Sequence, residues 1–141
     1  IVMLESINDH ENLGAIARTA RGLGVDALLL DPTCADPFYR RSVRVSMGEL
    51  LHLPIIRCAG WAEVFEVLAD AGFEIWALTP SSTAIDIFEM VTPARWAIVV
   101  GAEGTGLSQE TLARCTNVRI PMSNGVDSLN VGHAVAAALA R

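Results

Sequence analysis

Residues 118–141 read VRIPMSNGVDSLNVGHAVAAALAR, and they predict a strand that runs through a loop into a helix. The short segment 118–120 predicts the last strand, and the alanine-rich segment 129–141 predicts the final helix of the domain. Ser128 suits the N-cap of that helix. Asn130 would then lie in the first turn, where asparagine is a poor helix former, so we expect its amide to point at another group.

The rest of the chain alternates short apolar runs with amphipathic stretches. Helices are predicted at 12–23, 61–71, 108–115 and 129–141, with a partly helical segment at 38–53. Strands are predicted at 1–4, 25–30, 54–57, 73–78, 96–100 and 118–120. Segment 81–93, which holds a Ser/Thr cluster, is predicted to be the loosest connection. Continuous apolar strands that alternate with helices predict one α/β domain, in which helices cover both faces of a parallel sheet.

The composition bounds the class of protein. The 141 residues include 10 Lys+Arg against 16 Asp+Glu, a formal net charge of -6, and 52% are hydrophobic. This apolar content excludes a disordered tail, and the length suffices for one domain with a sizeable core. The longest apolar stretches fall well short of the roughly 20 residues that a membrane-spanning helix needs. Three widely spaced cysteines without a CxxC pair argue against a disulfide framework or a zinc ribbon and favour the reducing cytoplasm.

A glycine-rich loop, GAEGTG at 101–106, follows the predicted strand 96–100. Glycines at the end of a strand allow the backbone to approach a ligand closely, although many such loops are only turns. The order GxxGxG matches neither the dinucleotide fingerprint GxGxxG nor the phosphate loop, which argues against a nucleotide-binding oxidoreductase. Glu103 in the middle of the loop would repel a phosphate and suits a cation or a hydroxyl donor.

The segment ENLGAIART at 11–19 opens the first predicted helix. Asn12 and Arg18 lie six residues apart, so they share a face only if Asn12 lies at or before the start of the helix. One interpretation is that Asn12 is an N-cap and Arg18 is solvated. The other is that both face a ligand, because ligands of parallel α/β sheets bind at the carboxyl ends of the strands.

Together, the segments ENLGAIART, VVGAEGTGLS and IPMSNGVDSLNV resemble the three motifs of the SpoU (TrmH-like) family of RNA ribose 2′-O-methyltransferases, within the SPOUT class. The resemblance covers essentially the whole chain, and the order and spacing of the motifs match. Three positions depart from the family pattern, which often has proline at His10, asparagine at Ala102 and serine at Gly132. None of these departures removes a residue that the chemistry needs.

The resemblance implies a parallel α/β sheet whose C-terminal segment threads through a loop to form a deep trefoil knot. True knots are rare among protein folds, so composition alone could not suggest this one. The resemblance also implies that S-adenosylmethionine (SAM) binds in the knot, held mainly by backbone groups and apolar side chains. The matching positions are Thr79, Gly101, Ile120, Met122, Ser128 and Leu129.

The same resemblance assigns catalysis to Asn12, Arg18, Glu103, Ser128 and Asn130. Arg18 is implicated in activating the ribose 2′-oxygen. Because a guanidinium hardly deprotonates in proteins, we expect Arg18 to bind the RNA phosphate and to stabilise the developing alkoxide. Glu103 is expected to fix that guanidinium through a carboxylate–arginine fork. No metal is expected, since the three histidines show no ligand spacing.

The resemblance further implies a homodimer through the knotted region and an RNA substrate, either rRNA or tRNA. Arg40, Arg41 and Arg44 form the one concentrated basic cluster, which is either a phosphate-contacting rim or a solvated helix face. A net charge of -6 is unusual for a free-standing RNA binder. The family pattern that this charge fits implies that residues 1–141 are the methyltransferase domain of a longer cytoplasmic protein, with a separate N-terminal RNA-binding domain. The alternative is a non-catalytic knotted module for RNA binding or dimerisation, against which the retained catalytic residues argue.

Overall fold

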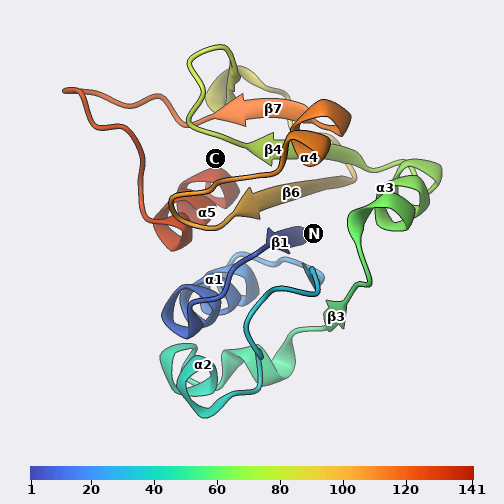
Figure 1. Ribbon diagram of the computed structural model, residues 1–141, viewed down its shortest axis with the longest axis vertical. Coiled ribbons are helices and arrows are strands. Elements are labelled where there is room, and N and C mark those ends of the chain that lie inside the picture. Colours follow the sequence, from blue (N-terminus) through green and yellow to red (C-terminus); the bar gives the residue numbers. More distant parts are fainter.

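Seven strands form one sheet in which every neighbouring pair is parallel, in the order β3-β2-β1-β6-β4-β7-β5 (Figure 1). The computed structural model describes residues 1–141. The strands are β1 (Val2–Glu5), β2 (Leu28–Leu30), β3 (Ile55–Arg57), β4 (Glu74–Leu78), β5 (Ile85–Asp86), β6 (Trp96–Gly101) and β7 (Thr116–Arg119). The helices are α1 (His10–Gly22), α2 (Arg40–Val45), α3 (Trp61–Asp70), α4 (Gln109–Arg114) and α5 (Val131–Leu139), with 3-10 turns η1 (Glu49–His52) and η2 (Ile87–Glu89).

Strand β6 joins the two halves of the sheet. It lies between β1 and β4, with Leu4 opposite Val100 on one side and Ala77 opposite Val99 on the other. The carboxyl ends of β1, β4 and β6 therefore meet at one edge, although β1 and β6 are separated by about two thirds of the chain. This edge is where the loops that carry the three motifs begin.

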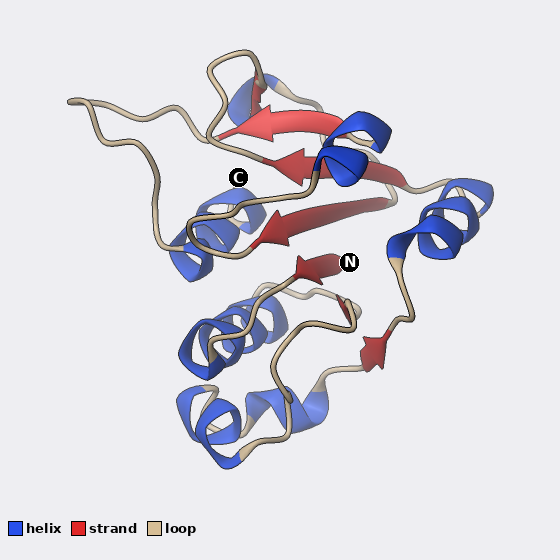
Figure 2. Cartoon of the chain, viewed as in Figure 1, coloured by secondary structure: helices blue, strands red, loops and turns tan.

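Helices cover both faces of the sheet, as the sequence predicts (Figure 2). On one face, α1 and α5 pack against alternate strand residues such as Val2, Leu4 and Ile98. On the other, α3 packs against the residues between them, such as Met3 and Val99. The two hydrophobic clusters fix the positions of α1 and α5 at the carboxyl edge of the sheet, next to β6.

The predicted helices and strands are all present within a few residues of their expected bounds, with three corrections. Segment 81–93 is not wholly loose, because Ile85 pairs with Val118 to form the last strand of the sheet. Helix α5 is capped by Asn130 and not by Ser128, since the Asn130 side chain accepts hydrogen bonds from the backbone N–H groups of Gly132 and His133. Helix α1 is capped by Asp9, whose carboxylate accepts from the backbone N–H of Glu11, so Asn12 is not the N-cap. No helix in the fold combines the length and the apolar character required to traverse a bilayer.

Candidate functional site

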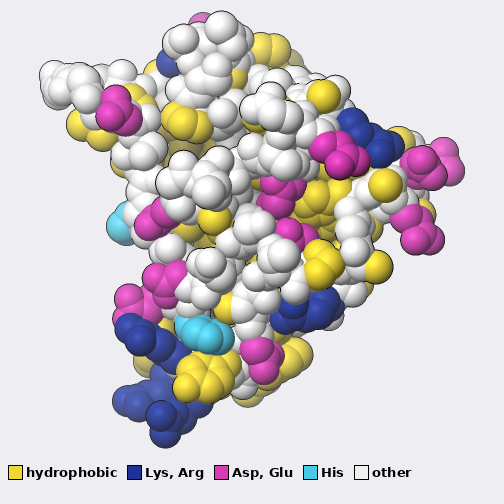
Figure 3. All heavy atoms as spheres, in the orientation of Figure 1, with side chains coloured by type: hydrophobic (Ala, Val, Ile, Leu, Met, Phe, Trp, Pro, Cys, Tyr) yellow, Lys and Arg dark blue, Asp and Glu magenta, His cyan; other side chains and the backbone are white.

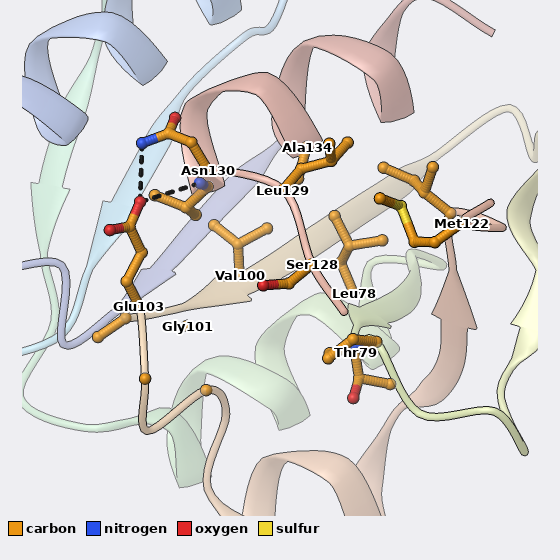
Figure 4. A pocket seen from close by; sticks show the side chains of 16 residues that line it. Leu78, Thr79, Val100, Gly101, Glu103, Met122, Ser128, Leu129, Asn130 and Ala134 are labelled. Atoms are coloured by element: carbon orange, nitrogen blue, oxygen red, sulfur yellow. Dashed lines mark hydrogen bonds between the residues drawn. The ribbon is translucent and has the colours of Figure 1, made fainter. Parts of the chain in front are cut away.

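A cavity of about 510 Å³ opens at the carboxyl ends of β4, β6 and β7, beside the start of α5 (Figure 4). This volume lies within the range of small-molecule sites, about 300–1,000 Å³. All six residues predicted to bind the cofactor line it: Thr79, Gly101, Ile120, Met122, Ser128 and Leu129. Apolar side chains from the same elements complete the wall, namely Leu78, Val100, Val131 and Ala134.

The glycine loop forms one wall of this cavity with its backbone. The loop folds back on itself, because the N–H of Gly106 donates to the carbonyl of Ala102 at 2.9 Å. A side chain at Gly101 has no room, since a Cβ atom there would lie 2.3 Å from the carbonyl carbon of Gly106. Gly104 and Gly106 have φ angles of +90° and +67°, which glycine adopts without steric cost. The loop is therefore tight, and it exposes backbone to the cavity.

Glu5 ties the end of the glycine loop to the sheet. Its buried carboxylate accepts hydrogen bonds from the N–H of Ser108 at 2.6 Å, the indole of Trp61 at 2.8 Å and the hydroxyl of Thr111. Ser108 in turn caps α4, because its Oγ accepts from the N–H of Thr111 at 3.2 Å. The sequence analysis missed Glu5. Its one signal is an acidic residue that directly continues the apolar run 1–4.

Three side chains, one from each motif, meet at the rim of the cavity. Asn130 Nδ2 donates to Glu103 Oε1 at 2.7 Å and to Asn12 Oδ1 at 2.8 Å, and Asn12 Nδ2 donates to Glu103 Oε1 at 3.3 Å. The N–H of Val131 reaches the same carboxylate oxygen at 3.4 Å (Figure 4). The expectation that the Asn130 amide points at another group is thus confirmed. Residues 12, 103 and 130 form one network at the edge of the cavity.

The electrostatic character of the cavity is set by a single residue. Among the sixteen residues that line it, Glu103 is the only one with a charged side chain. The other lining residues are apolar, glycine or uncharged polar (Thr79, Ser128 and Asn130), and no cluster of His, Cys, Asp or Glu is placed to hold a metal ion. A carboxylate without a neighbouring cation favours a positively charged ligand and disfavours a phosphate.

Arg18 does not join this network within the chain. It lies in the third turn of α1, is exposed, and makes no hydrogen bond or ion pair. Because Asn12 lies inside the helix, six residues place Arg18 about 120° around the axis from it. Within one chain, Glu103 and Arg18 do not form the expected fork, and the amides of Asn12 and Asn130 bond to Glu103 Oε1 instead.

The three predicted RNA-binding arginines all lie on α2 and are exposed. Cationic side chains gather at the end of the molecule where α2 lies (Figure 3). Arg41 forms an ion pair with Glu11, and this contact raises the pKa of the Arg41 guanidinium. Arg40 and Arg44 have no acidic partner. The cluster therefore touches the first turn of α1, which also carries Asn12.

Known proteins resemble this chain over nearly its whole length. Residues 1–140 match the sequence profile of the SpoU rRNA Methylase family. The chain belongs to this family. An uncharacterized tRNA/rRNA methyltransferase of Mycobacterium tuberculosis is 49% identical to it over 144 residues, which cover 99% of this chain and 49% of that protein. The chain thus spans about half the length of the curated relatives that it matches.

Solved structures of SpoU-type proteins share the fold. The SpoU methyltransferase AviRb of Streptomyces viridochromogenes, solved in complex with AdoMet, superposes with a TM-score of 0.90 at 28% identity, over 98% of this chain and 56% of that chain. A protein solved in work on 2-OH methylation of C/U34 on tRNA gives a TM-score of 0.86 at 26% identity, over 97% of this chain and 89% of that chain. The α/β architecture of this SpoU domain is therefore that of proteins solved with AdoMet.

Proposed function

We propose that this chain is the catalytic domain of a SAM-dependent RNA methyltransferase that acts on a ribose 2′-hydroxyl of rRNA, or alternatively of tRNA. The observation that carries the proposal is the network of Asn12, Glu103 and Asn130 at the rim of an apolar cavity in a SpoU-family chain. The three free cysteines fit a protein of the reducing cytoplasm.

The residues of the cavity fit SAM. Met122 and Leu129 would hold its apolar parts, the backbone next to Gly101 would hold its polar groups, and the carboxylate of Glu103 suits its positive charge. When bound, SAM would supply a methyl group on a sulfonium sulfur: the acceptor oxygen bonds to the methyl carbon while the S–CH₃ bond breaks and the sulfur leaves as a neutral thioether. The chain has to position the acceptor hydroxyl in line with the S–CH₃ bond of SAM. Positioning of this kind lowers a reaction barrier by about 7–11 kcal/mol.

The rim network holds the ribose. Glu103 is fixed by two amides, so it presents its carboxylate in one orientation to a hydroxyl donor at the mouth of the cavity. Asn130 is itself fixed, because its Oδ1 caps α5 through the N–H of Gly132 at 2.9 Å. Ser128, exposed on the cavity wall, offers a hydroxyl to the same substrate. Removal of the 2′-hydroxyl proton by a general base typically raises the reaction rate by a further 10²–10⁴-fold.

We place Arg18 at the active site of a second copy of the chain, in a homodimer formed through the knotted region. Its exposure on α1, which packs against α5, supports this assignment. There Arg18, which is always positively charged, binds the RNA phosphate and stabilises the developing alkoxide.

The knot itself forms where the segment after β7 passes the glycine loop. The return of α5 to lie beside β6 and α1 supports that threading (Figure 1).

A net charge of -6 supports a separate N-terminal RNA-binding domain in the full-length protein. The domain of residues 1–141 alone is then expected to dimerise and to methylate RNA poorly. Robust turnover by this domain alone would contradict that part of the proposal.

Calorimetric titration with SAM, followed by transfer from radiolabelled SAM to total RNA of cells that lack the gene, tests the function. We expect the full-length protein to do both. Arg18→Ala should keep the SAM dissociation constant within a few-fold and abolish transfer. SAM binding by the full-length protein without any transfer would favour the alternative, a non-catalytic knotted module.

Complementation tests the position of Arg18. A heterodimer that combines Arg18→Ala with the cavity-blocking Gly101→Leu, purified through two different tags, keeps one intact cavity and one Arg18 on opposite subunits. If the arginine acts across the interface, this heterodimer regains transfer that neither homodimer shows. An inactive heterodimer that still binds SAM would refute the assignment.

A further inference from the structure

Two aromatic rings in tilted contact lie beside the arginine cluster, at the junction of α1 and α2. The centroids of the His10 and Tyr39 rings are 4.5 Å apart, with an angle of 34° between the ring planes. His10 opens α1, and Tyr39 directly precedes Arg40 at the start of α2. In the space-filling view, a histidine and hydrophobic side chains adjoin the cationic end of the molecule (Figure 3).

His10 is held in place while Tyr39 stays accessible. The Nδ1 atom of His10 forms a hydrogen bond with Ser42 Oγ at 2.9 Å, and Ser42 is fully buried in α2. Tyr39 is 49% exposed, and the neighbouring Phe38 is 59% exposed. The Tyr39 ring therefore rests on a fixed imidazole and offers π-surface to solvent. Neither Tyr39 nor Phe38 is needed to fill the core.

The charges around this ring suit nucleic acid. Three of the ten cationic residues of an otherwise acidic chain fall within residues 40–44. Glu11 neutralises only Arg41, which leaves Arg40 and Arg44 available for phosphates. Aromatic rings interleaved with arginines are the arrangement by which proteins bind unpaired nucleotides, because bases stack on the rings while the cations hold the backbone.

The same turn of α1 connects the ring pair to the rim of the cavity. His10 and Asn12 are two residues apart, so their Cα atoms lie about 5 Å apart and their side chains project to nearly opposite sides of the helix. Asn12 reaches Glu103 and Asn130, whereas His10 reaches α2. An RNA strand that crosses the start of α1 would therefore meet the cavity rim and the exposed ring together.

We propose that Tyr39, supported by His10, stacks with an unpaired base of the RNA substrate close to the methylated nucleotide, while Arg40 and Arg44 hold the adjoining phosphates. This inference rests on the proposed function and specifies how the substrate is held. It implies that the target lies in a single-stranded loop or in a locally opened helix, because a paired base has no free face to offer.

Steady-state methyl transfer by the full-length protein tests the stacking, with total RNA from cells that lack the gene as the varied substrate. We expect Tyr39→Ala to raise the KM for RNA about tenfold, with the SAM dissociation constant unchanged within twofold. Tyr39→Phe and Tyr39→Trp should restore the wild-type KM, because they keep an aromatic face. Phe88→Ala is the matched control, since Phe88 is an aromatic residue that is 53% exposed but lies next to β5, at the opposite edge of the sheet from β3.

The salt dependence separates stacking from charge. Removing Arg44 should lower the slope of log KM against log salt concentration by roughly 0.7–0.9, the value for one phosphate contact. Removing the Tyr39 ring should leave that slope unchanged. An unaltered KM in Tyr39→Ala, or a Tyr39→Phe variant as weak as Tyr39→Ala, would overturn the stacking. A wild-type protein that transfers no methyl to this RNA would instead refute the proposed function.

Discussion

The substitution Gly101→Ala tests whether the tight glycine loop shapes the cofactor cavity. The new Cβ would lie 2.3 Å from the carbonyl carbon of Gly106, 2.4 Å from its oxygen and 2.6 Å from the nitrogen of Leu107, whereas ordinary contacts begin at 3.4 Å. The opposing strand of the loop therefore has to retreat by about 1 Å. All three atoms belong to backbone, so no rotamer change relieves the overlap.

The expected magnitude follows from this overlap. Overpacking a well-packed site costs about 1–3 kcal/mol. If the loop yields, the cost appears as lost SAM affinity, and about 1.4 kcal/mol corresponds to a tenfold rise in the dissociation constant. If the loop holds, the cost appears as lost stability, at roughly 3 °C of Tm per kcal/mol for a domain of this size. We expect both, with SAM affinity at least tenfold weaker and Tm lower by several degrees.

Calorimetric titration with SAM and thermal unfolding followed by circular dichroism measure the two effects. Gly22→Ala is the matched control, because the same Cβ at the end of α1 meets nothing within 4 Å. That variant should bind SAM normally and melt at or slightly above the wild-type temperature. A Gly101→Ala protein with wild-type affinity and wild-type Tm would refute the role assigned to the loop.

Three further variants probe other parts of the domain. Glu5→Gln places an NH₂ group against hydrogen-bond donors, so the free energy of unfolding in urea should fall by about 1–3 kcal/mol, and unchanged stability would show that Glu5 does not anchor the loop. Gly14→Ala places a Cβ 2.7 Å from the Ser42 carbonyl oxygen, so α2 should be pushed away from α1 and the Tm should drop by several degrees. An unaltered Tm would contradict this close packing. Burial raises the pKa of the Cys34 thiol to about 12, so above pH 9 the unfolded chain releases a proton that the folded chain keeps. The free energy of unfolding should therefore fall with rising pH, by at most about 1.4 kcal/mol per pH unit. Urea unfolding between pH 9 and 11 should show a shallower decline for Cys34→Ala, and an identical slope would contradict the assignment.

Helix α1 shows how far apolar spacing carries a prediction. The pattern 12–23 agrees with the observed His10–Gly22 because Leu13, Ile16 and Ala20 all pack into the core. The pattern does not set the first residue of the helix, which the local hydrogen bond of Asp9 decides. The start at His10 places Asn12 inside the helix and so sets its angle to Arg18, which could not be read from the sequence.

Some residues of the candidate site could likewise be predicted from the sequence, and others could not. Glu103 and Asn130 stand out locally, one as a carboxylate among glycines and the other as a poor helix former at a helix start. The cavity positions came from the resemblance to the SpoU family, and the structure gathers them around one space. The hydrogen bond between Glu5 and Ser108 joins residues 103 positions apart, and no local pattern predicts a contact over that separation.

The late insertion of β6 has a consequence for synthesis. When the ribosome has made β1 through β4, the edges of β1 and β4 still lack the strand that will lie between them. At roughly 5–20 residues per second, the 23 residues from the end of β4 to the end of β6 take about 1–5 s to be made. During this interval the three-stranded sheet β3-β2-β1 and the lone strand β4 expose unpaired edges to solvent, so production of the protein should depend on chaperones that bind such edges more than the stability of the finished domain would suggest.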